Sequence, residues 1–234
     1  MDGKNTWASG VLELLRHADS HLELGSAFDS RIAFISIDNS VETSVRTFLS
    51  LPEKLSGFKF PRKEKDEAGN SFPKMVELLF KYASSKLIGL DEGDIEHYHR
   101  IRNQLYHDGT GLSVDSRYLK AYRQIAAVLL NNLFGVETEK VNKTVSIENL
   151  ILLWNQLESS IHTKFKQHNI SAGHTFKWEQ LEKTGEISWD QFERLTKLRM
   201  IRNHQAHSTT ENFDYDQLET GVRLAEALLG ELNG

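Results

Sequence analysis

The chain carries helical periodicity almost throughout and has few residues that break helices. Apolar residues recur at intervals of three and four over long stretches, and no convincing alternation of apolar and polar residues indicates a strand. The 234 residues include 3 prolines and 15 glycines, which leaves long stretches free to be helical. We therefore predict an all-α fold.

The bounds of the predicted helices follow from local start and stop residues. Pro52 ends the second helix, and Ser188 with Gln191 has the spacing of a capping box that opens a later one. The charged stretch 57–70 is expected to be an exposed loop. We expect helices over residues 6–24, 27–51, 72–89, 93–108, 115–134, 146–166, 175–183 and 215–232, and one that opens at Ser188.

A polar connector divides the predicted helices into two groups. Residues 135–144 lack an apolar pattern and follow the helix that ends near Phe134. We therefore predict two helical domains, over residues 6–135 and 145–233, the second shorter than the first.

The hexapeptide Arg-Asn-x-x-x-His occurs twice, and both copies follow an isoleucine within a predicted helix. The first spans Arg102 to His107 and the second spans Arg202 to His207, one hundred residues later. The repeat extends further, because Asn39-x-x-Glu42 and Asn155-x-x-Glu158 match in the long helix that precedes each motif. We interpret the chain as a two-copy repeat.

The motif gathers groups that suit a phosphodiester. On a helix, Asn103 and His107 share a face, and Arg102 lies about 100° away but is long enough to bend toward the same rim. Guanidinium groups pair with phosphate oxygens, and imidazoles transfer protons near neutral pH. If the two motif helices pack about a pseudo-twofold axis, one composite site receives both copies.

With these motifs the chain resembles a tandem pair of HEPN domains, an all-helical family whose ribonuclease members carry an Arg-x4-6-His motif. The resemblance covers residues 10–135 and 145–233. It implies two HEPN-like helical bundles packed as an intramolecular pseudo-dimer, and a metal-independent endoribonuclease that uses the ribose 2′-hydroxyl as nucleophile. It also implies a role in defence or stress, as a toxin-like effector.

The resemblance assigns a role to each motif residue. His107 and His207 are the expected acid and base groups, and Arg102 and Arg202 stabilise charge on the phosphate. The supporting residues are Asn103 and Asn203, which orient the imidazoles or the phosphate, and Glu42 and Glu158, which tether the arginines.

The two motif copies differ in their inner residues. The second carries an extra histidine, His204, and a small Ala206, whereas the first carries Leu105 and Tyr106. We therefore expect an asymmetric site or one degenerate half. The alternatives to an enzyme are a non-catalytic RNA- or nucleotide-binding module and a protein-docking platform. The sequence is also compatible with an enzyme that a regulatory protein partner holds inactive. It is compatible with either a monomer or a homodimer.

The composition of the chain argues against several other kinds of site and partner. The chain has no cysteine, which excludes disulfides and thiolate metal sites and favours a cytoplasmic location. No segment approaches 18 consecutive apolar residues, so we expect no membrane partner. The net charge of -5 argues against broad, nonspecific nucleic-acid binding. His17 and His21 are four apart, but no third ligand is suitably spaced, so we expect neither a metal nor another cofactor.

Overall fold

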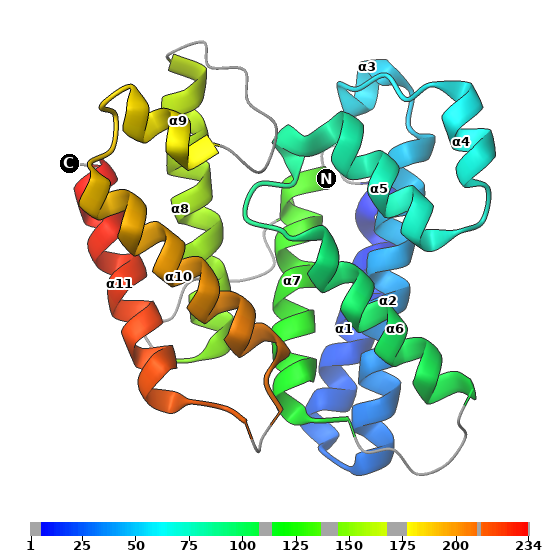
Figure 1. Ribbon diagram of the computed structural model, residues 1–234. Coiled ribbons are helices and arrows are strands. Elements are labelled where there is room, and N and C mark those ends of the chain that lie inside the picture. Colours follow the sequence, from blue (N-terminus) through cyan, green and yellow to red (C-terminus); the bar gives the residue numbers. More distant parts are fainter. Residues whose placement is uncertain (1–5, 108–113, 137–144, 168–176, 210–211, 234) are drawn as a thin grey trace. The chain divides into compact units, whose positions relative to one another are not determined.

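The computed structural model describes residues 6–107, 114–136, 145–167, 177–209 and 212–233 (Figure 1). All regular structure in these ranges is helical, which confirms the predicted all-α fold. Within the same ranges, every helix is too short or too polar to cross a bilayer. The chain separates into two compact units, residues 1–140 and 141–234. Each unit is described by itself, and the paired packing of the two halves stays a prediction.

The described residues of unit 1 form seven α-helices. They are α1 (Ser9–Leu24), α2 (Ala27–Ser50), α3 (Glu53–Ser56), α4 (Arg62–Ala68), α5 (Phe72–Ala83), α6 (Glu92–His107) and α7 (Ser116–Phe134), with 3-10 turns at Thr6–Ala8 and Ser84–Lys86.

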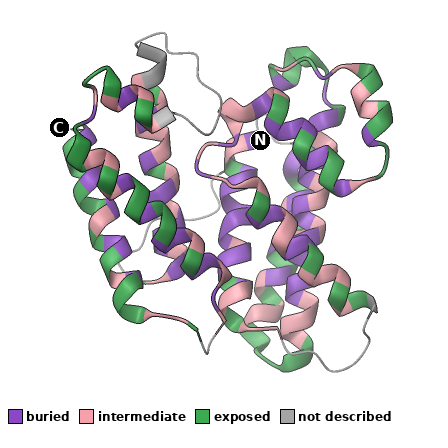
Figure 2. Cartoon of the chain, in the orientation of Figure 1, coloured by how far each residue is buried: buried purple, intermediate pink, exposed green. Residues whose placement is uncertain are grey.

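Helix α2 lies at the centre of unit 1. It packs against α1, α5, α6 and α7. Phe34, Ile37, Val41 and Val45 are completely buried and repeat at intervals of three and four, so one face of α2 enters the core. Each such side chain contributes about 1.5–3 kcal/mol on burial. Figure 2 shows the buried residues concentrated along α2 and α7.

Both ends of α2 are specified locally. The Ser26 side chain accepts a hydrogen bond from the Asp29 backbone N–H at 3.1 Å and caps the first turn. Leu51 is extended, with a ψ of 140°, as expected for a residue that precedes a proline. The predicted stop at Pro52 is therefore correct, and the short α3 begins directly after this proline.

The prediction of a loop over residues 57–70 is wrong in part, because α4 forms there. Pro61 precedes the helix, and its fixed φ suits this position. Glu64 of α4 accepts hydrogen bonds from Lys81 at 2.8 Å and from the Tyr82 hydroxyl at 2.5 Å, both on α5. These contacts to α5 stabilise a charged segment whose own apolar pattern is too weak to indicate a helix.

Helix α5 is shorter than predicted. It ends at Ala83 and is followed by the 3-10 turn Ser84–Lys86, whereas the sequence indicated a helix as far as Gly89. Gly89 has a φ of +74°, a left-handed conformation that belongs to the connection with α6. Two other predicted helix ends, residue 108 and residues 175–176, lie outside the described residues.

The described residues of unit 2 form the helices α8 (Ile147–Gln167), α9 (Lys177–Lys183), α10 (Trp189–His207) and α11 (Tyr215–Asn233). Helix α8 packs against α10 and α11, and α10 also packs against α11. The predicted capping box is present: Ser188 accepts from the Gln191 backbone N–H, and the Gln191 side chain accepts from the Ser188 N–H. This cap fixes the start of the helix that carries the second motif.

The two units share one helix pattern. In unit 1 the long α2, the motif helix α6 and the last helix α7 contact one another pairwise. In unit 2 the long α8, the motif helix α10 and the last helix α11 do the same. The repeat read from the sequence thus corresponds to a repeated set of three helices.

Candidate functional site

Helix α6 presents Arg102 on the face that packs into unit 1. Ile95 and Tyr98 are completely buried, His99 is 8% exposed, and Arg102 follows at the next helical position of this stripe. The spacing of three, one and three residues is that of an ordinary apolar helix face. Arg102 therefore occupies a position where most helices carry an apolar side chain, and its charge needs partners inside the protein.

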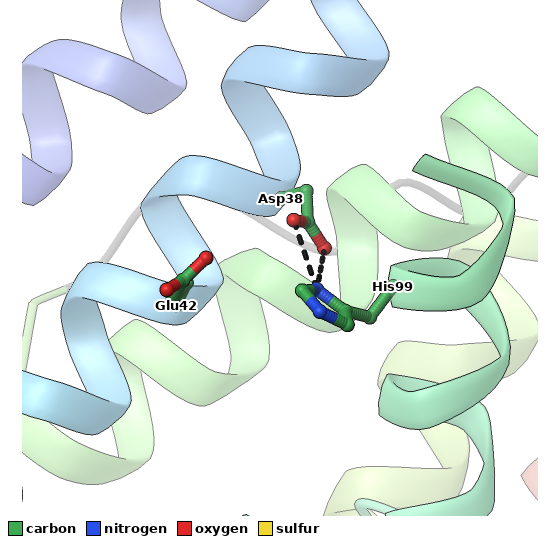
Figure 3. Close-up of side chains that lie close together, drawn as sticks. All are labelled: Asp38, Glu42 and His99. Atoms are coloured by element: carbon green, nitrogen blue, oxygen red, sulfur yellow. Dashed lines mark hydrogen bonds and ion pairs between the residues drawn. The ribbon is translucent and has the colours of Figure 1, made fainter. Parts of the chain in front are cut away.

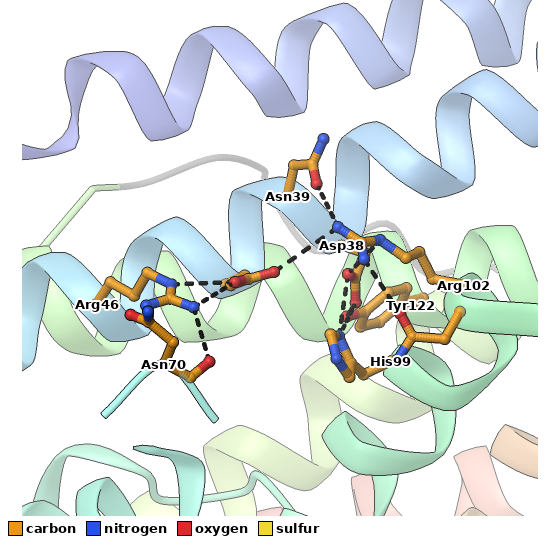
Figure 4. A network of polar contacts seen from close by, with 9 residues as sticks. Asp38, Asn39, Arg46, Asn70, His99, Arg102 and Tyr122 are labelled. Atoms are coloured by element: carbon orange, nitrogen blue, oxygen red, sulfur yellow. Dashed lines mark hydrogen bonds and ion pairs between the residues drawn. The ribbon is translucent and has the colours of Figure 1, made fainter. Parts of the chain in front are cut away.

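Asp38 of α2 is the central partner. Its carboxylate is completely buried and lies 3.1 Å from the Arg102 Nε atom. The Tyr122 hydroxyl of α7 donates to it at 2.6 Å, and the His99 Nδ1 atom lies 3.2 and 3.1 Å from its two oxygens (Figures 3 and 4). Burial of an unpaired carboxylate is costly, and the Arg102 ion pair together with the Tyr122 and His99 hydrogen bonds offsets that cost.

The rest of the Arg102 guanidinium contacts the next turn of α2. Its Nη2 atom donates to the Asn39 side-chain oxygen at 3.0 Å and lies 3.7 Å from a Glu42 oxygen. Glu42 in turn accepts two hydrogen bonds from Arg46, at 3.0 and 2.8 Å, and Arg46 donates to the Asn70 carbonyl (Figure 4). Glu42 therefore lies where a tether for Arg102 was expected, with Asp38 in closer contact.

The asparagine of each motif accepts a hydrogen bond from its own arginine. The Arg102 Nη1 atom donates to the Asn103 side-chain oxygen at 3.1 Å, and Arg202 donates in the same way to Asn203 at 3.3 Å. Adjacent residues do not normally face each other on a helix. Both arginines therefore bend toward the asparagine, and the two copies share this local geometry.

The tyrosine in the network is held protonated. Burial, and then the charge of Asp38, raise the pKa of the Tyr122 hydroxyl well above its ordinary value. The hydroxyl is consequently a hydrogen-bond donor at neutral pH, which is the form that the Asp38 carboxylate needs.

Asp38, Glu42 and His99 also form a set of ligand atoms that lie within 4.8 Å of one another (Figure 3). Carboxylate and imidazole groups in this number suit a divalent cation. Here the Arg102 guanidinium already lies against both carboxylates, so a cation at this position would meet a positive charge. In this structure Asp38 and Glu42 therefore pair with the Arg102 guanidinium.

The second motif is more deeply buried than the first. Arg202 is buried, at 1% exposed, whereas Arg102 is half-buried. Its neighbours Gln205 and Ala206 are also buried, and Gln205 donates to the Asp214 carbonyl at 3.1 Å. The Ser208 hydroxyl lies 3.3 Å from His204 Nδ1. The second arginine is thus much less accessible to a ligand from solvent.

The remaining predicted site residues lie on the expected helices. Glu158 and Asn155 are half-buried on α8, which packs against α10. His207 is half-buried at the end of α10. His107 is the last residue of α6, and its side chain lies outside the described residues.

Sequence reasoning missed Asp38 and Tyr122. Asp38 interrupts the buried stripe of α2, one position after Ile37 and three before Val41. A charged residue at a core position was the available indication of a buried network. His99 and Tyr122 lie 61 and 84 residues from Asp38 in the sequence, so the pairing itself could not be read from spacing.

We compared the chain with family models, with curated proteins and with solved structures, and none of them matches it.

Proposed function

We propose that this protein is a metal-independent endoribonuclease in which Arg102 binds the scissile phosphate and the motif histidines transfer protons. The observation that carries the proposal is the fixed and partly exposed Arg102 guanidinium. Asp38, Asn39 and Asn103 hold it from three directions, and 20% of the side chain is exposed. A cation oriented before the substrate arrives stabilises developing negative charge without reorganisation.

The contacts of Arg102 leave hydrogen-bonding capacity for a ligand. A guanidinium has five N–H groups. Among the described residues, its hydrogen bonds to Asn39 and Asn103 use one N–H on each terminal nitrogen, and its Nε atom faces Asp38. An N–H on Nη1 is therefore available for a phosphate oxygen.

The reaction follows from the groups in the motif. One histidine removes the proton of the ribose 2′-hydroxyl, and the 2′-oxygen forms a bond to phosphorus. The bond from phosphorus to the 5′-oxygen breaks, and the second histidine protonates the leaving oxygen. The products are a 2′,3′-cyclic phosphate and a 5′-hydroxyl, and the charge that a metal often balances is balanced by the guanidinium.

The test is cleavage of a labelled tRNA and mRNA panel by the purified full chain in excess EDTA. We expect cuts that end in 2′,3′-cyclic phosphate with the wild type and none with His107→Ala/His207→Ala. His17→Ala is the matched control, because this histidine is exposed on α1, and it should cut normally. Undiminished cleavage by the double variant, or a strict metal requirement, overturns the proposal.

A defence or stress effector of this kind has a cellular consequence. Expression of the active enzyme should slow growth, and the double histidine variant should relieve the effect. Harmless expression of a wild type that cuts RNA in vitro argues against the effector role and leaves the enzyme in place.

One observation favours a second candidate, a module that binds RNA or a nucleotide without cutting it. The charge of Arg102 is already balanced by Asp38 and Glu42, which reduces its pull on a transition-state charge. In this case the wild type and the double histidine variant bind RNA equally, and both leave it intact. Fluorescence anisotropy beside the cleavage assay separates the two candidates.

A further inference from the structure

An exposed aromatic ring lies beside the candidate phosphate-binding arginine. Tyr106 is 62% exposed, an unusual fraction for a ring of this size. The Arg102 guanidinium carbon lies 5.1 Å from the centre of the ring, one helical turn away. The ring also directly precedes His107 in the chain. An aromatic face thus adjoins the cation of the first motif.

Tyr106 is not needed to hold Arg102 in place. Asp38, Asn39 and Asn103 already fix the guanidinium. The contact of an arginine with an aromatic ring at an exposed site is a weak one. A role in holding Arg102 does not explain why the Tyr106 ring is exposed. The ring is therefore available for a ligand.

The second motif has no such ring. Ala206 occupies the equivalent position and is 1% exposed. The difference between the copies is therefore chemical as well as geometric: the first combines a partly exposed arginine with an exposed aromatic face, and the second has neither.

We propose that Tyr106 is a stacking subsite for the nucleobase next to the phosphate bound by Arg102, which rests on the proposed function. Single-stranded RNA is recognised through bases that stack on aromatic side chains while the backbone is held by cations. The occupant of the subsite is a base of single-stranded RNA. Purines, which have the larger aromatic face, bind better than pyrimidines.

The test measures binding of two fluorescent decamers to the full chain by anisotropy at low salt. One is 2′-O-methyl oligo(A), which resists cleavage, and the other is the same backbone with abasic residues. We expect Tyr106→Ala to weaken oligo(A) binding about 5- to 150-fold, the range typical of one lost base stack. Tyr106→Phe and Tyr106→Trp should bind within about twofold of the wild type, because both keep a ring.

The abasic decamer separates stacking from an indirect effect. It should bind the wild type and Tyr106→Ala equally, because it has no base to stack. Equal losses on both decamers mean that Tyr106 acts through Arg102, and unchanged oligo(A) binding by Tyr106→Ala means that no base stacks there. Either result overturns the subsite and leaves the ribonuclease proposal intact. A wild type that binds neither decamer overturns both proposals. Circular dichroism of each variant checks that the fold is retained.

Discussion

At the scale of single residues, Asp38 determines how the first motif is held. Its buried carboxylate connects α2 with the motif arginine on α6 and the tyrosine on α7. Asp38→Ala should lower the free energy of unfolding by about 3–5 kcal/mol, because it leaves Arg102 largely buried without its closest anion. Urea unfolding followed by circular dichroism measures this loss.

The matched control is an aspartate in an exposed ion pair. Asp66 lies 3.8 Å from Arg62 with 73% of its side chain exposed. Asp66→Ala should change the free energy of unfolding by about 0–1 kcal/mol. Equal losses for the two variants contradict the central role of Asp38.

The Tyr122 hydroxyl predicts a change of stability at high pH. Its pKa is raised in the folded protein, first by burial and then by Asp38, so the folded state keeps a proton that the unfolded chain loses above about pH 10. Stability from this group is thus complete below pH 10 and declines as the pH rises, by about 1.4 kcal/mol per pH unit. Tyr122→Phe should therefore be less stable than the wild type at pH 7, with a gap that narrows above pH 10.

Urea unfolding between pH 7 and pH 11 measures the gap. Tyr215→Phe is the control for an exposed tyrosine, because Tyr215 is 65% exposed. A constant gap for Tyr122→Phe across the same range contradicts a hydroxyl that stays protonated in the fold.

At the scale of helices, a close approach in unit 2 depends on a glycine. A Cβ atom at Gly221 of α11 would lie 2.9 Å from Ile201 Cγ2 of α10 and 3.3 Å from Leu150 Cδ1 of α8. Alanine favours a helix over glycine by about 1 kcal/mol, but overpacking costs about 1–3 kcal/mol, and the β-branched Ile201 has little freedom to move. Gly221→Ala should therefore destabilise the protein by roughly 1 kcal/mol.

The same helix offers a control of opposite sign. A Cβ atom at Gly230 meets nothing within 4 Å, so Gly230→Ala should stabilise the protein by about 0.4–1 kcal/mol. Thermal unfolding of both variants gives the comparison. Stabilisation by both substitutions contradicts the close packing of α10 and α11 at Gly221.

Helix prediction succeeded where the ends and the apolar face were encoded locally. Pro52 and the Ser188–Gln191 capping box specify ends that the structure reproduces. Helix α4 was missed because its stabilising partners, Lys81 and Tyr82, lie on another helix. The same distinction holds for the candidate site. Arg102 and Glu42 were predicted from the repeat, whereas Asp38 and Tyr122 reach the site through contacts between distant segments of the chain.

At the scale of the whole molecule, the chain repeats a set of three helices, but the side chains around the motif arginine differ between the two copies. Residues between the long helix and the motif helix form α3, α4 and α5 in unit 1 and α9 in unit 2. Arg102 is partly exposed beside an open tyrosine, and Arg202 is buried beside an alanine. The motif of the first copy is therefore more accessible from solvent than that of the second.

Variants of the two motif histidines show whether both motifs take part in one reaction. If the ribonuclease needs both histidines, His107→Ala and His207→Ala should each reduce kcat/KM by about 10²–10⁴-fold, the range of one general acid or base. The double variant should then be no slower than the slower single variant, because the effects of groups that act as a unit are not additive.

Two independent sites predict a different pattern: each single variant keeps the activity of the intact copy, and only the double variant loses it. If the first copy alone is active, His207→Ala cuts RNA at the wild-type rate, which contradicts the composite site expected from the repeated motif. Initial rates on one labelled RNA, with circular dichroism of each variant, distinguish these three patterns.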